Sequence, residues 1–169
     1  MAQREVVSID TSFWVHAGMV RGHHDLLAEF DVTVPGAVAE EFGAAKPAPS
    51  SVSGQALRVA LQSGTVRVLD PQGPLIPEFH AGERAVLTLA LEGKGNLTPL
   101  IDEAKAYLWA VKRGLPVLSV PLWLATCALR GQADPWEAIA KIKALVEGRH
   151  VSMLLAHEAL VLLAAATRR

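Results

Sequence analysis

Four acidic residues occupy positions from which their carboxylates could meet. Asp10 and Asp102 each end a short apolar run, and Glu83 lies in the first turn of a predicted helix. Glu41 lies within another predicted helix. Carboxylates brought close together repel one another unless a cation offsets their charge, and Mg²⁺ or Mn²⁺ prefers oxygen ligands of this kind. Such an ion can lower the pKa of a water and neutralise the charge that develops on a phosphodiester. The four acids therefore predict metal-dependent hydrolysis of phosphodiester bonds.

Each acid taken alone also has a structural interpretation. An Asp at the end of a strand often caps the following helix, and a Glu in a first helical turn interacts favourably with the helix dipole. The set of four, in this order and of these types, favours a site more than any single member does. Glu40 is a second candidate beside Glu41, and Glu103 could be a fifth acid of the site or a helix-start residue.

The elements that would position these acids alternate between strands and helices. Short apolar runs predict strands at 5–10, 32–34, 65–69, 96–102 and 115–120. Helical spacing predicts helices at 12–22, 35–45, 55–63, 82–93, 103–114, 121–130, 134–147 and 152–166. Such alternation is typical of a parallel sheet covered on both faces, with ligands bound at the carboxyl ends of the strands. We therefore predict a single three-layer α/β/α domain over residues 1–169, with its core at about 5–120 and C-terminal helices at about 121–166.

Four blocks of the sequence resemble the PIN domain family. They are VVSIDTSFWVHAG, VPGAVAEEF, HAGERAVLTLALEG and LIDEAKAYLWAVKRGLPVL, and they run from about residue 5 to about residue 120. The four candidate acids fall one in each block, at gaps of 31, 42 and 19 residues. The similarity is to the branch whose third acid begins a Gly-Glu helix and whose fourth follows a strand-end Ile.

This resemblance implies a PIN-like, Rossmann-like fold and a metal-dependent ribonuclease, as in the toxins of VapC-like toxin–antitoxin pairs and in RNA-processing nucleases. Carried over by position, it implies that the residues that hold Mg²⁺ or Mn²⁺ and place the attacking water are Asp10, Glu41, Glu83 and Asp102. Glu41 is preferred to Glu40 because the family's acid directly precedes a large apolar residue, here Phe42. Ser12 matches the family's small polar residue after the first Asp and could orient that Asp or a water.

The chain departs from the family pattern at two places after the fourth acid. Tyr107 stands where the family usually has an Arg, which weakens the case for a fixed phosphate contact there. Ser119 and Val120 stand where the family's next strand usually continues with Gly-Thr, which could alter the sheet edge beside the site. Neither departure removes a candidate carboxylate.

The charge of the chain is divided along its length. The net charge is −1, but residues 1–104 hold 7 basic and 13 acidic side chains, whereas residues 105–169 hold 9 basic and 4 acidic ones. The acidic part contains all four candidate ligands, and the basic part begins directly after the last. Its members could contact an RNA backbone or be ordinary solvated helix faces; the candidates are Lys105, Lys112, Arg113 and Arg130.

Several other signals favour structural roles. Cys127 lies in an apolar run and is predicted to be a buried hydrophobe, and the pair His23-His24 is predicted to lie in a solvated turn. His80 could lie at the rim of the site. The four tryptophans (Trp14, Trp109, Trp123 and Trp136) lie on apolar helical faces suited to core or dimer packing. With a lone cysteine, no signal-peptide pattern and no apolar run of membrane length, we expect a cytoplasmic protein.

Two function classes remain open alongside the leading hypothesis of an endoribonuclease that leaves a 5′-phosphate and a 3′-hydroxyl. One is a PIN-like module that binds RNA or protein with little turnover, and the other is a small-molecule phosphatase on a similar sheet. The resemblance also implies a homodimer and, for a toxin, a small antitoxin protein that would block the acidic rim. No membrane partner is expected.

Overall fold

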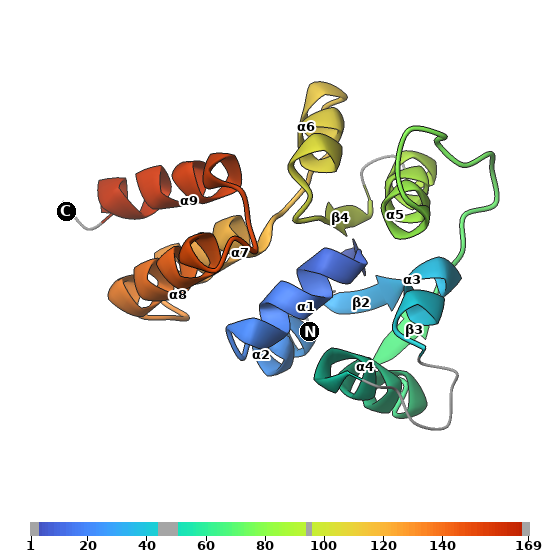
Figure 1. The fold of residues 1–169 in the computed structure, drawn as a ribbon, viewed down its shortest axis with the longest axis horizontal. Helices are drawn as coiled ribbons and strands as arrows, with labels where there is room; N and C mark the ends of the chain where they lie inside the picture. The colour runs from blue at the N-terminus through green and yellow to red at the C-terminus, as the bar shows by residue number, and fades with distance from the viewer. Residues whose placement is uncertain (1–3, 44–50, 94–95, 167–169) are drawn as a thin grey trace.

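The fold is built around a parallel sheet. In the computed structural model, which describes residues 4–43, 51–93 and 96–166, the sheet has four strands in the order β3-β2-β1-β4 (Figure 1). Val7 of the central strand pairs with Val32 on one side and with Thr98 on the other. The strands are β1 (Val6–Ile9), β2 (Asp31–Val34), β3 (Val66–Val68) and β4 (Thr98–Leu100). As expected for a parallel sheet, β1, β2 and β4 are largely buried, whereas the edge strand β3 exposes Arg67 and Val68.

Helices connect and follow these strands. Their bounds are α1 (Thr11–Met19), α2 (His23–Glu29), α3 (Gly36–Glu41), α4 (Val52–Gln62), α5 (Ala81–Glu92), α6 (Ala104–Lys112), α7 (Val120–Leu129), α8 (Pro135–Glu147) and α9 (Met153–Ala166). Local sequence explains many of the ends. Ser51 and Ser119 accept hydrogen bonds from the first turns of α4 and α7, and Gly114 adopts a φ of +69° just beyond α6, where a side chain would be strained.

The path of the chain places helices on both faces of the sheet. From β1 through β2 to β3 the chain moves toward one edge, and from β3 to β4 it returns to the opposite edge. Because crossovers between parallel strands are right-handed, the helices of the two paths lie on opposite faces. Figure 1 shows α1, α2 and α4 on one side of the sheet and α5 on the other. The predicted three-layer α/β/α architecture is thus confirmed.

Two predicted elements were wrong. The segment 115–120 is not a strand of the sheet, because only Leu118 pairs with Leu100 before Ser119 begins α7. The predicted turn at His23-His24 is instead the start of α2, whose single buried side chain, Leu26, gives too weak a periodic signal to detect. His23 itself is half-buried and stacks on Trp14 with 3.9 Å between ring centroids. Of the helix predicted at 35–45, α3 accounts for Gly36–Glu41, and residues 44–45 lie outside the described residues.

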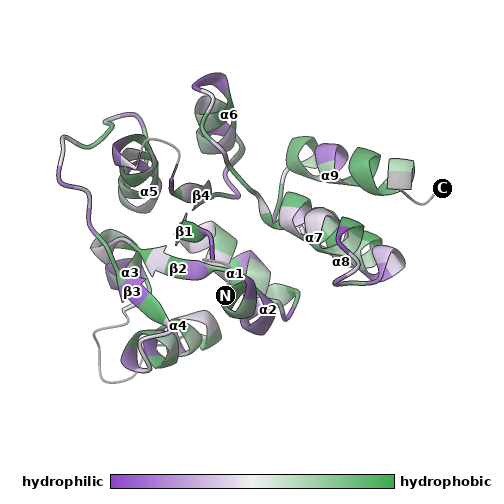
Figure 2. Ribbon diagram, turned by 180° about the vertical axis from the view of Figure 1, so that it is seen from behind, coloured by the Kyte–Doolittle hydropathy of each residue, from purple (hydrophilic) through white to green (hydrophobic). Residues whose placement is uncertain are grey.

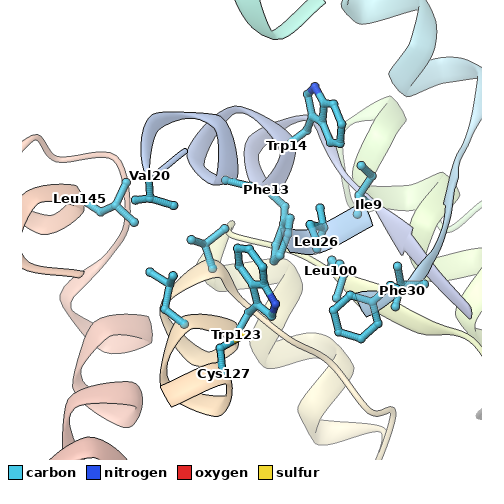
Figure 3. Close-up of a cluster of buried hydrophobic side chains, with 14 of the residues drawn as sticks. Ile9, Phe13, Trp14, Val20, Leu26, Phe30, Leu100, Trp123, Cys127 and Leu145 are labelled. Atoms are coloured by element: carbon cyan, nitrogen blue, oxygen red, sulfur yellow. The ribbon is translucent and has the colours of Figure 1, made fainter. Parts of the chain in front are cut away.

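The C-terminal helices share a core with the sheet. One buried cluster joins Ile9 and Phe13 to Trp123 of α7 and Leu145 of α8 (Figure 3), with 6.3 Å between the centroids of the Phe13 and Trp123 rings. Cys127 lies in the same cluster, and burial raises the pKa of its thiol to about 12, which confirms the prediction of a buried hydrophobe. The segment beyond residue 120 therefore packs into the main core.

Helix α9 is apolar around most of its circumference. Figure 2 colours most of its length as hydrophobic, and Met153, Leu154 and Val161 are exposed on it. A polar contact joins α9 to α6, because the hydroxyl of buried Tyr107 donates to the Glu158 carboxylate over 2.8 Å. Tyr107 thus has a packing role at the position of the family's Arg. No helix in the described part of the chain combines the length and apolar character needed to cross a membrane.

Candidate metal and active site

Asp10 lies at the carboxyl edge of the sheet, directly after the central strand β1. It caps α1, because its Oδ1 accepts a 2.7 Å hydrogen bond from the Phe13 backbone N–H. Asp102 follows the neighbouring strand β4, and the Asp10 N–H donates to the carbonyl of Leu100 at the end of that strand. Because β1 and β4 are parallel neighbours, both acids reach the same edge.

A pocket of about 460 Å³ opens at this edge. The residues that line it come from the start of α1, the end of α3 and the start of α5, and they include Asp10, Ser12, Glu41, His80, Gly82 and Glu83. Three of the four predicted acids and the predicted supporting Ser12 therefore share one pocket. Glu40 is exposed and is not among the residues that line this pocket as the structure describes it. His80 lies at the rim, exposed to solvent.

Asp10 is the most deeply buried of the acids that line this pocket. Its side chain is buried, and Oδ2 has no hydrogen-bond partner among the described residues. Burial raises the pKa of Asp10 well above its ordinary value, and although the Phe13 N–H opposes that shift, the nearby carboxylates of Asp102, Glu83 and Glu41 raise the pKa further. A buried anion without a partner for one oxygen is an arrangement that a cation would relieve.

Glu41 and Glu83 approach this carboxylate from the helices α3 and α5. The Thr11 hydroxyl donates a hydrogen bond to Glu41 Oε2, and the His80 backbone N–H donates to Glu83 Oε2 over 3.3 Å. Partial burial raises the pKa of Glu83; its His80 hydrogen bond acts in the opposite direction, and the charge of Glu103 adds to the increase. Glu103 itself accepts a 2.8 Å hydrogen bond from the Ala106 N–H and so caps the start of α6, which was one of its two predicted roles.

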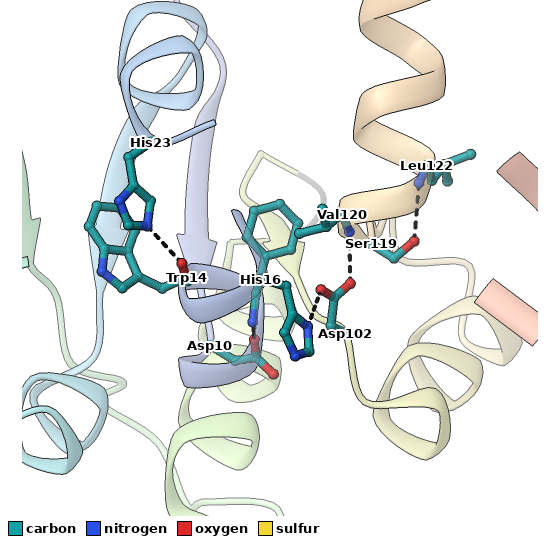
Figure 4. A network of polar contacts seen from close by, with 9 residues as sticks. Asp10, Trp14, His16, His23, Asp102, Ser119, Val120 and Leu122 are labelled. Atoms are coloured by element: carbon teal, nitrogen blue, oxygen red, sulfur yellow. Dashed lines mark hydrogen bonds and ion pairs between the residues drawn. The ribbon is translucent and has the colours of Figure 1, made fainter. Parts of the chain in front are cut away.

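Asp102 is held by two donors that the sequence did not reveal as a pair. His16 Nδ1 lies 2.8 Å from Asp102 Oδ2, and the Val120 N–H donates to Oδ1 over 2.7 Å (Figure 4). The Asp102 side chain is fully buried, and that of His16 is 11% exposed. The one sequence signal for His16 was that it is a polar residue among the apolar residues of the buried face of α1. The departure from the family pattern at Ser119-Val120 starts α7 and supplies the second donor.

The predicted basic contacts divide into two groups. Lys105, Lys112 and Arg113 are exposed on or next to α6. Lys105 lies 5.3 Å from the centroid of the Phe79 ring, which immediately precedes His80. Arg130 is ion-paired with Glu29 over 2.6 Å and lines a different pocket at the amino ends of the strands. It therefore lies at the edge opposite to the carboxylates.

The donor set fits a hard divalent cation in chemical type. The four acids supply carboxylate oxygens, and the buried Asp10 Oδ2 lacks a partner among the described residues. Over those same residues, however, no group of three or more His, Cys, Asp or Glu side chains forms a ready-made metal site. The acids are gathered at one edge but not closed into a coordination shell, so metal binding is a prediction from chemistry and position.

Gly82 allows α5 to approach the acids closely. A Cβ at this position would lie 3.1 Å from Val38 Cγ2 and 3.2 Å from Glu41 Oε1. We expect Gly82→Ala to displace Glu41 and weaken Mn²⁺ binding by about 10-fold, the lower end of what residues supporting a metal ligand contribute. Gly93→Ala is the matched control at the other end of α5, since its Cβ would meet Leu97 at 3.1 Å and has no acid among its nearest neighbours. Equal Mn²⁺ affinities by calorimetry in both variants would contradict the assigned role of Gly82.

Comparison with known families agrees with the fold. A family model described as a PIN domain matches residues 20–162, a range that begins after Asp10 and contains Glu41, Glu83 and Asp102. No curated protein matches the chain closely enough to count as a relative. The family match covers most of the chain, and the parallel sheet with its strand order agrees with it. The chain belongs to the PIN domain family.

Proposed function

We propose that this protein is a metal-dependent endoribonuclease. The observation that carries the proposal is the buried carboxylate of Asp10, whose Oδ2 has no hydrogen-bond partner among the described residues. This carboxylate shares a pocket with Glu41 and Glu83, and the charge of Asp102 helps to raise its pKa. Membership of a family whose members are commonly nucleases supports phosphodiester cleavage as the chemistry. RNA is the proposed substrate, and Mg²⁺ or Mn²⁺ the proposed cofactor.

The proposed roles of the side chains follow from their places. Asp10, Glu41, Glu83 and Asp102 would hold the ion. When bound, Mg²⁺ or Mn²⁺ lowers the pKa of a water and offsets the charge that develops on the phosphodiester. Thr11 fixes Glu41 through its hydroxyl, and Ser12, which also lines the pocket, is placed to orient a water or the scissile phosphate. His80, which lines this pocket, is exposed to solvent.

The direct test is cleavage of a labelled single-stranded RNA with Mg²⁺, with Mn²⁺ and with a chelator. We expect cleavage only with metal, 5′-phosphate and 3′-hydroxyl product ends, and loss of cleavage in Glu83→Gln. Cleavage that persists in chelator would contradict the proposal. RNA binding without cleavage under any metal would instead favour the catalytically weak binding module, and hydrolysis of phosphomonoesters alone would favour the phosphatase.

The exposed cations of α6 are the proposed contacts to the RNA backbone. No carboxylate within the described residues forms an ion pair with Lys105, Lys112 or Arg113, and the last acid before them, Glu103, is at the helix cap. Arg113 lies 3.6 Å from the centroid of the Trp109 ring, which holds its guanidinium along the helix. Together these groups provide a positive strip that begins beside the acidic pocket.

This strip predicts a change in the salt dependence of RNA binding. Each lost phosphate contact to a single strand should reduce the slope of log K against log salt concentration by about 0.7. We expect Lys105→Ala and Lys112→Ala each to reduce the slope by about this amount, measured by fluorescence anisotropy in an Asp10→Asn background that leaves RNA intact. Lys143→Ala removes an equal charge from α8, which Figure 1 shows beyond α7 and away from α6. An equal reduction in the Lys143 variant would show that total charge, and not this strip, determines binding.

The exposed apolar residues of α9 support a second part of the proposal, that the protein forms a homodimer. Met153, Leu154 and Val161 are between 46% and 63% exposed on this helix, and burial of such side chains between two copies would be favourable. Light scattering at micromolar concentration measures the mass, and a monomer would contradict this part.

A further inference from the structure

His16 is a buried polar residue with a specific contact to one of the proposed metal ligands. It lies on α1, six residues after Asp10, which caps the same helix. Its Nδ1 lies 2.8 Å from Asp102 Oδ2, and its side chain is 11% exposed. Because an ionised carboxylate can only accept hydrogen bonds, Nδ1 carries the proton in this contact. His16 therefore donates to Asp102.

The orientation of the Asp102 carboxylate is fixed from two sides. His16 donates to Oδ2, and the Val120 backbone N–H donates to Oδ1 over 2.7 Å (Figure 4). The two donors come from different helices, α1 and α7, so rotation of the carboxylate would break one contact or the other. A carboxylate offers about four lone-pair sites. Two therefore remain to bind a ligand after both donors are satisfied.

His16 also links Asp102 to Asp10. The helix that carries His16 is the helix that Asp10 caps, and the Asp102 charge is among those that raise the pKa of Asp10. A helix is stiff over the six residues that separate Asp10 from His16, so the hydrogen bond sets the distance between the two carboxylates through the backbone of α1. Loss of the donor would leave the Asp102 carboxylate with the Val120 N–H as its one remaining donor among the described residues.

We propose that His16 is a positioning residue, which holds the Asp102 carboxylate at the orientation and distance from Asp10 that binding of a divalent cation requires. The inference rests on the proposed function, because it assumes that these two acids share a cation. Side chains that support a metal ligand in this way typically contribute about 10- to 100-fold to metal affinity.

Another histidine provides the matched control. The Nε2 atom of His23 lies 2.7 Å from the backbone carbonyl oxygen of Trp14, and its ring stacks on the Trp14 ring. His23 is thus a half-buried histidine whose hydrogen bond is made to a backbone carbonyl of α1, whereas the buried His16 lies on α1 and contacts a carboxylate. Its removal should lower the melting temperature without changing the acids.

The experiment measures Mn²⁺ affinity of the full chain without RNA, by electron paramagnetic resonance of the free ion, together with the melting temperature in chelator. The variants are His16→Leu, which removes the donor, His16→Asn, whose amide nitrogen can replace Nδ1, and His23→Leu. We expect a loss of about 10- to 100-fold in Mn²⁺ affinity for His16→Leu, retention of most of the affinity in His16→Asn, and a lower melting temperature with unchanged affinity in His23→Leu.

Three results would overturn the inference alone. They are wild-type affinity in His16→Leu, an equal loss in His16→Asn and His16→Leu, and an equal loss in His23→Leu. A wild-type protein that binds no Mn²⁺ would instead overturn the proposed function and this inference with it. The wild-type titration therefore separates the two failures.

Discussion

Replacement of Asp10 by Asn should stabilise the fold in chelator and reduce RNA cleavage by at least about 100-fold. The activity loss follows because even residues that only support a metal ligand are worth about 10- to 100-fold. The stability gain follows because Asn keeps the cap on the Phe13 N–H and removes a buried charge that faces other carboxylates. The new amide N–H groups can also donate to those carboxylates.

The pH dependence of stability has a sign that follows from the raised pKa of Asp10. The folded state holds this proton more tightly than the unfolded state, so stability is greatest below the unfolded value of about 3.8 and falls as pH rises through the folded pKa. The difference in stability between Asp10→Asn and the wild type should therefore widen with pH over this range. Thermal melts in chelator measure this difference, because each kcal/mol of stability shifts the melting temperature of a chain of this size by about 2–4 °C.

Addition of Mn²⁺ provides the control for this prediction. The ion should raise the melting temperature of the wild type and leave that of Asp10→Asn almost unchanged, since a ligand stabilises only the state that binds it. A variant that melts below the wild type in chelator, or that gains as much as the wild type from Mn²⁺, would contradict the electrostatic account of Asp10.

Asp102→Ala should change stability in the opposite direction. Asp102 accepts from both His16 and Val120 in a fully buried position, and its removal leaves both donors without a partner. Each orphaned buried donor costs about 1–3 kcal/mol, so we expect the free energy of unfolding to fall by about 2–4 kcal/mol once the relieved repulsion with Asp10 is included. Cleavage should also be lost.

Chemical denaturation with urea measures this effect, and Asp102→Asn provides the intermediate case, because its amide keeps one acceptor oxygen. The expected order of stability in chelator is Asp10→Asn above the wild type, then Asp102→Asn, then Asp102→Ala. Two acids of one site would thus affect stability in opposite directions. If Asp102→Ala were as stable as the wild type, the hydrogen bonds of Asp102 to His16 and Val120 would make no net contribution to stability.

The sequence was sufficient to predict the features that depend on local pattern. The β-branched run before Asp10 predicted β1, and the carboxyl-edge rule for parallel sheets placed Asp10 and Asp102 together. The spacing of apolar residues predicted α5, and with it the position of Glu83 at the start of that helix. The individual strands and helices depend on a few neighbouring residues, and the edge rule holds for any strand of a parallel sheet, which is why both could be predicted without the fold.

The features that depend on distant contacts could not be predicted. His16 and Asp102 are 86 residues apart, and nothing in either segment indicates that they meet. The segment 115–120 has the composition of a strand, but Ser119 and Pro121 begin α7 there and leave only the Leu118 bridge. Trp136 was predicted to pack on an apolar face, and it is 70% exposed.

The central claim is that the acids at the carboxyl edge of the sheet bind a divalent cation together. A crystal structure of the protein soaked in Mn²⁺, with the anomalous signal of manganese, tests this most directly. The account predicts an anomalous peak in the pocket between Asp10 Oδ2 and the carboxylates of Glu41 and Glu83, and no peak there in Asp10→Asn. A fully ordered pocket without a peak, or a peak only elsewhere on the molecule, would contradict it.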